Sequence, residues 1–311
     1  MKKSFLTIAI AAFTLTALPS LADVVVYGKA NVSVQQADEN DNDKIEVVSN
    51  ASRIGIKGSE VISGGLKAIY QFEYQTEVDD GTTASNQTFS QRNIYVGLQG
   101  SGGTVIAGNF DTPTKALQEK IDVFNDLEGD IINIMRGEIR SKNIVQYTTP
   151  GSWGGFATSV AFVGKETDGV DDGYSAAVSY TSPVFYIGVS MDQDVEAVDV
   201  DLLRAALRVN LGPVQFGALA EEYDNSIAEK ETGYLGSVLW NITPNWVAKL
   251  QYGQSDVKML DGETASVGVD YKLSSNMTIF TYYTTVENDV LVELANPRDD
   301  KYAGVGFDLK F

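Results

Sequence analysis

Apolar and polar residues alternate with a period of two along most of this chain. Between Val25 and Val34, the even positions are apolar or small, and most odd positions are larger or polar. The stretch from Leu66 to Tyr74 repeats the pattern, with polar residues at Lys67, Gln71 and Glu73. Successive side chains of a β-strand point to opposite faces, so the pattern predicts strands with one apolar and one polar face.

Runs of this kind can be followed from residue 23 to the last residue of the chain. We place sixteen of them, near residues 23–36, 46–58, 66–77, 89–99, 104–111, 140–148, 155–164, 172–182, 184–192, 200–211, 214–223, 231–241, 246–256, 263–273, 277–287 and 300–311. An even number of strands fits an antiparallel sheet that closes on itself.

Short and long connections alternate between these runs. The short ones contain turn residues, as in Ser63 to Gly65 and Gly212-Pro213, whereas the long ones are polar and often acidic, as in Ala37 to Lys44 and Lys165 to Asp172. This wiring is typical of an outer-membrane barrel with short periplasmic turns and longer external loops. In lipid, only a closed barrel leaves no strand edge unpaired. We therefore predict an all-β fold, a transmembrane antiparallel β-barrel of 16 strands.

One long segment, Asp111 to Gly137, fits neither a strand nor a tight turn. It is the third long connection, and its acidic residues are Asp122, Asp126, Glu128 and Asp130. We expect this loop, over about residues 111–139, to fold into the barrel and to narrow its pore.

The first 22 residues have the pattern of a secretory signal peptide. Lys2 and Lys3 precede an apolar run from Phe5 to Leu18, and small residues at Ser20 and Ala22 provide a cleavage site. The apolar run is shorter than the roughly 20 residues that a membrane-spanning helix needs. We expect residues 1–22 to be removed and residues 23–311 to form the barrel.

The composition excludes several classes of chemistry. The chain has no Cys and no His, so disulfides, Ser-His-Asp triads and the common zinc sites are impossible. Without Lys2 and Lys3, 21 basic side chains face 42 acidic ones, a net charge of −21. Such a chain is repelled by phosphate backbones, so we expect no nucleic-acid partner. We also expect no catalytic residue, no cofactor and no metal site.

Several short motifs occur in a fixed order along the chain. They are VYGKA at 26–30, SRIGIKG at 52–58, QRNIYVGL at 91–98 and the terminal Phe311. In this order and at these spacings they resemble the general diffusion porins of Gram-negative outer membranes. The resemblance implies passive diffusion of small hydrophilic solutes and ions through a homotrimer of 16-stranded barrels. It also implies contact with outer-membrane lipid and lipopolysaccharide, and recognition of Phe311 by the barrel assembly machinery.

The same resemblance implies a pore constriction between a basic wall and an acidic loop. By motif, the basic residues are Lys29, Arg53, Arg92 and Arg140, and the acidic candidates are Asp122, Asp126, Glu128 and Asp130. Alternation independently places Lys29, Arg53 and Arg140 on the polar face. Arg92 instead shares its parity with Ile94, Val96 and Leu98, so its place in the lumen depends on the resemblance alone.

Two other functions remain compatible with this sequence. One is a substrate-specific channel, although most Tyr and Phe residues fall on the apolar parity rather than along the lumen. The other is a structural or adhesive barrel whose pore is plugged. For an open pore, the acidic loop leads us to expect a mild cation preference, which the neutralisation of Asp126, Glu128 and Asp130 would remove.

Overall fold

The computed structural model describes residues 23–82, 86–288, 290–291 and 298–311, so the expected signal peptide lies outside the described residues. Most of the described chain is β-strand. The strands of the main sheet are β1 (Asp23–Glu39), β2 (Asn42–Ser49), β3 (Arg53–Ser63), β4 (Leu66–Gln75), β5 (Ser90–Gly100), β6 (Gly103–Asp111), β7 (Arg140–Thr148), β8 (Phe156–Val163), β9 (Gly173–Thr181), β10 (Phe185–Gln193), β11 (Asp201–Leu211), β12 (Val214–Asp224), β13 (Glu231–Asn241), β14 (Trp246–Ser255), β16 (Gly262–Lys272), β17 (Met277–Asn288) and β19 (Arg298–Lys310).

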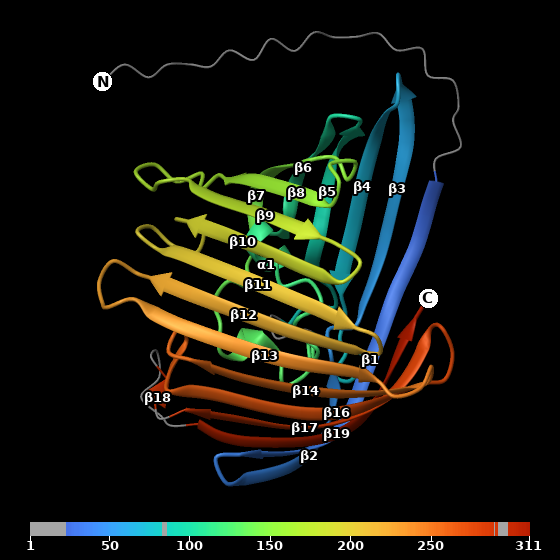
Figure 1. Cartoon of the computed structure of the whole chain (residues 1–311), viewed down its shortest axis with the longest axis vertical. Coiled ribbons are helices and arrows are strands. Elements are labelled where there is room, and N and C mark those ends of the chain that lie inside the picture. The colour runs from blue at the N-terminus through green and yellow to red at the C-terminus, as the bar shows by residue number, and fades with distance from the viewer. Residues whose placement is uncertain (1–22, 83–85, 289, 292–297) are drawn as a thin grey trace.

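These strands form one closed antiparallel ring, which is drawn in Figure 1. Each strand pairs with its neighbours in the chain, and β19 pairs with β1 from Lys29 opposite Lys310 to Glu39 opposite Asp300. β2 and β3 are two halves of one barrel strand, because both pair with β1 and only Asn50 to Ser52 separate them. The 17 segments of this sheet therefore make 16 strands, which confirms the predicted barrel.

The predicted alternation is visible in the burial of the strands. On β1, Asn31, Ser33 and Gln35 are buried inside the ring, whereas Val34 between them is exposed on the outer surface. The outer face of the other strands is similarly apolar. Among the described residues, no helix is both long enough and apolar enough to cross a bilayer.

The first external connection differs from the prediction. We expected a polar loop from Ala37 to Lys44, but β1 and β2 continue through most of it and are joined by Asn40 and Asp41 alone. Both residues have positive φ, 50° and 66°. Asn and Asp tolerate this left-handed conformation, which a two-residue hairpin requires. The acidic sequence of this segment thus encodes a tight turn.

The remaining elements lie between these strands. Two short strands, β15 (Met259–Leu260) and β18 (Val290–Leu291), pair in a separate small sheet. The segment between β6 and β7 contains the helix α1 (Pro113–Ala116) and the 3₁₀ helix η1 (Ile131–Asn133). Figure 1 shows this green segment inside the ring, as expected for the third long connection.

The largest buried apolar cluster lies between this inserted segment and the inner wall. Residues of the segment contribute Leu117, Ile121, Phe124, Ile131, Ile134 and Met135. The wall contributes residues from several strands, among them Tyr186 of β10, Leu219 of β12, Leu235 of β13 and Phe280 of β17. The core of this protein is therefore inside the barrel, where it fixes the position of the loop.

Candidate functional site

The inserted loop packs against the inner face of β9 to β17, which we call the seat wall. Four strands of this wall have a glycine where an apolar side chain of the loop lies close. A Cβ atom at each position would lie 2.4 to 3.0 Å from the loop side chain; the pairs are Gly188 with Leu117, Gly217 with Ile121, Gly253 with Ile134 and Gly268 with Phe124. The wall thus has recesses that match the apolar side of the loop.

A fully buried arginine ties the loop exit to the seat wall. Arg204 of β11 donates to Glu221 of β12 at 2.6 and 3.0 Å and to Glu138 of the loop at 2.7 Å. The carboxylate of Glu221 also accepts the backbone N–H of Arg136 at 2.8 Å. A buried charge is tolerated when it is paired and hydrogen-bonded, as Arg204 is here.

Asp122 has a structural position within the loop. Its carboxylate accepts the backbone N–H groups of Phe124 and Ile131 at 3.0 and 3.1 Å, and the side-chain amide of Gln251 at 3.0 Å. Its exposed fraction is only 7%. Among the four acidic candidates, Asp122 therefore holds the loop together and attaches it to β14.

The opposite side of the loop faces the inner wall of β1 and β3 to β7, which we call the open wall. Here Asp126 accepts from Lys29 at 2.9 Å and from Arg53 at 3.2 Å. Burial opposes ionisation of this carboxyl, but the charges of Lys29 and Arg53 hold the pKa of Asp126 below its ordinary value. Three of the predicted residues are thus in direct contact.

Arg92 lies in the lumen because of a β-bulge. Phe72 pairs with Ile94 and Tyr74 pairs with Gln91, so Arg92 and Asn93 together face the single residue Glu73. A bulge of this kind re-aims side chains that simple alternation would send to the other face. Arg92 donates to Glu73 at 3.1 Å and to Gln75 at 2.9 Å.

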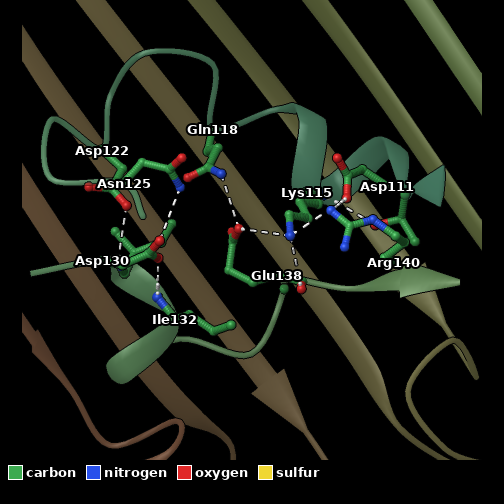
Figure 2. Close-up of polar contacts among 12 residues, drawn as sticks. Asp111, Lys115, Gln118, Asp122, Asn125, Asp130, Ile132, Glu138 and Arg140 are labelled. Carbon is green, nitrogen blue, oxygen red and sulfur yellow. Dashed lines mark hydrogen bonds and ion pairs between the residues drawn. The ribbon is translucent and has the colours of Figure 1, made fainter. Parts of the chain in front are cut away.

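Arg140 continues this row of charges at the loop exit. It pairs with Asp111 at 2.9 Å and donates to Asn93 at 3.0 Å. Figure 2 shows Lys115 between Asp111 and Glu138, whose carboxylates lie 3.6 and 3.9 Å from its ammonium group. Basic and acidic groups therefore alternate around this part of the lumen.

A polar cavity of about 560 Å³ remains between the loop and the open wall. Its charged lining residues are Arg53, Glu73, Arg92, Asp111, Lys115, Asp126, Asp130, Glu138 and Arg140. Asp130 borders it while accepting the backbone N–H groups of Asp126 and Ile132 at 2.8 and 2.9 Å. Glu128 is not part of its lining and instead accepts from Gln35 at 2.9 Å. This polar cavity thus lies on the open-wall side of the loop, opposite the packed apolar side.

Comparison with known proteins matches this chain, over residues 7–291, to the family model described as Gram-negative porin. The chain belongs to the Gram-negative porin family. Porins are channels rather than enzymes, and they are located in the outer membrane. The chain is 30% identical over 202 residues to the major outer membrane protein P.IB of Neisseria gonorrhoeae. That match covers 60% of this porin and 55% of the relative, little more than half of the relative's length.

Solved structures with low sequence identity share the fold. An anion-selective porin from Comamonas acidovorans has a TM-score of 0.77 at 20% identity, and the match covers 93% of this chain and 100% of that one. OmpT of Vibrio cholerae, solved in a trimer form, has a TM-score of 0.67 at 13% identity, with coverage of 94% and 100%. These likenesses extend over the whole barrel.

Several charged residues that line the polar cavity were absent from the sequence-based prediction. They are Glu73, Asp111, Lys115 and Glu138. Glu73 lies on the polar parity of β4, so alternation alone indicates that it faces the lumen. Asp111, Lys115 and Glu138 lie in or beside a segment with no period, and only the fold brings them to the cavity.

Proposed function

We propose that this porin is a passive channel for small hydrophilic solutes and ions, and that the passage between the loop and the open wall is its constriction. The observation that carries this proposal is the contrast between the two sides of the loop. The seat side is closed by packed apolar side chains, whereas the open side is a polar cavity lined by paired charges. A wet, charged passage of this kind admits hydrated solutes and rejects large or apolar ones.

The roles of the predicted residues follow from their contacts. Lys29, Arg53, Arg92 and Arg140 form the basic wall, and Asp126 and Asp130 are the acids of the loop that border the passage. Asp122 supports the loop from within, and Glu128 contacts β1 away from the passage. We therefore reduce the acidic side of the constriction to two of its four candidates.

The comparisons give no support to the expected cation preference. The Comamonas porin, a structural neighbour, is described as anion-selective. In the present chain each basic residue of the passage has an acidic partner, as in the Arg92 pair with Glu73 and the Arg140 pair with Asp111. We propose a nearly charge-balanced constriction, whose intrinsic ion preference is weak.

The same proposal includes processing and assembly. Residues 1–22 are removed as a signal peptide, and residues 23–311 form the mature barrel. Three barrels associate, as supported by the family and by the trimer form of the Vibrio neighbour. Lipid and lipopolysaccharide surround the apolar outer face, and the barrel assembly machinery recognises Phe311.

Conductance across a planar bilayer tests this function. The purified protein is inserted from detergent, and current is recorded in 1 M KCl. We expect ohmic steps that close in groups of three, and swelling of liposomes that contain the protein in small sugars. The absence of current from folded, inserted protein would contradict the proposed channel function and favour a plugged structural or adhesive barrel. Swelling with only one sugar would favour a substrate-specific channel instead.

A further inference from the structure

The charges of this porin are distributed unequally between the two ends of the barrel. The seven short connections, residues 64–65, 101–102, 149–155, 182–184, 212–213, 242–245 and 273–276, contain no charged side chain. By contrast, the long connections are strongly acidic; the segments 164–172 and 194–200 alone contain seven carboxylates. In Figure 1 the C-terminus lies on the same side as the short turn between β11 and β12. We call this side the short-turn end and the other the long-loop end.

Lysines occupy the inner face of the barrel at the short-turn end. Lys272 and Lys310 are the last residues of β16 and β19, and Lys67 is the second residue of β4. Lys57 lies six residues before the end of β3. They lie on one arc of the wall, in which β16, β17, β19, β1, β3 and β4 are successive neighbours, and we call these four residues the lysine ring. Each shares its parity with a lumenal residue: Lys57 with Arg53, Lys67 with Glu73, Lys272 with Asp270 and Lys310 with Asp308.

The lysine ring is not neutralised by nearby acids. Within the described ranges of the chain, no carboxylate forms an ion pair with any of these four lysines; Lys57 instead lies over the ring of Tyr27, with its ammonium group 5.0 Å from the centroid. Three acids share the lumenal parity near this end: Asp23, the first residue of β1, forms no ion pair with these lysines, and the remaining two have other partners. Asp270 pairs with Lys249 at 2.9 Å, and Asp308 lies 3.8 Å from Lys29. The lumen is therefore positive at its short-turn end.

The long-loop end has the opposite sign. Many of its basic side chains are already paired, as Lys44 is with Glu39 and Glu46 at 2.9 and 3.1 Å. Lys230 is similarly paired with Glu222 at 2.7 Å. The long connections contain more acidic than basic side chains, so the mouth of the pore at this end is negatively charged. The nearly balanced constriction separates the two charged regions.

From this arrangement we propose that the pore is bipolar along its axis and rectifies ionic current, an inference that rests on the proposed channel function. Cations enter readily through the negative long-loop end, and anions enter readily through the positive short-turn end. When the long-loop side is made positive, both ions are driven inward through their favourable ends and accumulate. With the opposite voltage each ion meets the end that repels it, and the pore is depleted of carriers.

Salt concentration controls the size of this effect. The Debye length is about 3 Å at 1 M, about 10 Å at 0.1 M and about 30 Å at 0.01 M. Fixed charges therefore control the ion content of the lumen in dilute salt and are screened in concentrated salt. The conductance at positive and negative voltage should differ at low salt and become equal at high salt.

Single-channel recording with fixed orientation tests the proposal. The chain contains no Cys, and Ile227 in the connection between β12 and β13 is 92% exposed. An Ile227→Cys variant is biotinylated and bound to streptavidin, which cannot cross the bilayer, so the long-loop end stays on the side of addition. With that side positive, we expect a conductance at least about 1.5-fold higher than with it negative at 0.01 M KCl, and equal conductances at 1 M.

Charge removal at the lysine ring provides the matched comparison. The variant with Lys57, Lys67, Lys272 and Lys310 all changed to Gln should lose the asymmetry. A control variant with Lys44→Gln, Lys230→Gln and Lys301→Gln, at the long-loop end, should keep or increase it. Circular dichroism verifies that each variant is folded. Symmetric conductance of the wild-type chain at 0.01 M would overturn the bipolar pore while leaving the channel intact, whereas absence of any conductance would overturn the proposed function itself.

Discussion

The two inner walls of this barrel obey the same alternation but perform different tasks. The seat wall has small residues such as Gly217 and Gly268 beside the loop and buries the charge of Arg204 completely. The open wall has long charged side chains such as Arg53 and Arg92, which border the polar passage. A period of two therefore identifies the lumenal face, and the size of its residues decides where the loop lies against it.

The comparison also explains why the loop has two different sides. Its apolar residues and Asp122 face the seat wall, where the free energy of burial and the hydrogen bonds to the backbone hold it. Its charged residues Asp126 and Asp130 border the passage. Changes on the seat side should thus affect stability first, and changes on the open side should affect ion selectivity first.

The largest expected effect is at Arg204. In an Arg204→Ala variant, the buried carboxylate of Glu221 loses Arg204 and that of Glu138 keeps only the longer contact with Lys115 at 3.9 Å, which should lower the free energy of unfolding by about 3–5 kcal/mol. Thermal unfolding in detergent micelles measures the change. A Lys230→Ala variant, which breaks an exposed ion pair with Glu222, is the control and should unfold like the wild type. A loss below about 1 kcal/mol at Arg204 would mean that the ion triad does not hold the loop.

A smaller loss of stability is expected at Gly268. A Cβ atom there would lie 2.8 Å from the carbonyl oxygen of Thr281 and 3.0 Å from the ring of Phe124. Gly268→Ala should therefore cost about 1–3 kcal/mol and displace the loop towards the passage, which reduces single-channel conductance. Gly236→Ala is the matched control, since its Cβ would have no atom within 4 Å. Equal behaviour of the two variants would contradict the glycine recesses.

The sequence predicts the open wall better than the seat wall, for a physical reason. Alternation is a property of each single strand, so it suffices to place Lys29, Arg53 and Arg140 on the inner face. Alternation fails to place Arg92 on the inner face, because the bulge at Arg92 depends on the pairing of two strands. Alternation also does not predict the burial of Arg204, because an arginine on the polar parity is expected to be solvated unless a loop covers it.

Within the loop, the sequence indicates the composition but not the orientation of each acid. A segment without a regular period gives no basis for separating Asp122, which faces its own backbone, from Asp126, which faces the wall. The hairpin at Asn40 and Asp41 is a related case. The polar run around these residues has the composition of an external loop, and only strand pairing shows that two residues suffice to turn the chain.

At Asp126 the main expected effect is on ion selectivity. Asp126→Asn removes the shared partner of Lys29 and Arg53 while keeping a hydrogen-bond acceptor. We expect the reversal potential in a KCl gradient to shift towards anion preference, with a smaller loss of stability than in Arg204→Ala because the Asn side chain retains a hydrogen-bond acceptor. Glu128→Gln is the control because Glu128 does not line the passage. The assignment fails if the two substitutions shift the reversal potential equally.

The smallest expected effect is the pH dependence of the difference in reversal potential between the wild type and Asp126→Asn. Lys29 and Arg53 keep the pKa of Asp126 below its ordinary value although burial opposes them. A carboxyl with a depressed folded pKa contributes stability above its unfolded pKa and loses that contribution as the pH falls through the folded pKa. Asp126 should thus stay ionised from pH 7 to about pH 4.5, since ordinary aspartate titrates near pH 3.9.

The measurement is the difference in reversal potential between the wild type and Asp126→Asn over this pH range. A constant difference indicates that Asp126 remains charged and paired across the passage, and a decline should begin only below the ordinary aspartate pKa of about 3.9. A difference that disappears by about pH 5 would instead show a carboxyl whose pKa is raised, as burial alone would cause. In that case the contacts of Asp126 with Lys29 and Arg53 would be too weak to offset the effect of burial on its pKa. Asp126 would then be neutral at mildly acidic pH, and the constriction would carry a net positive charge there instead of the proposed balance.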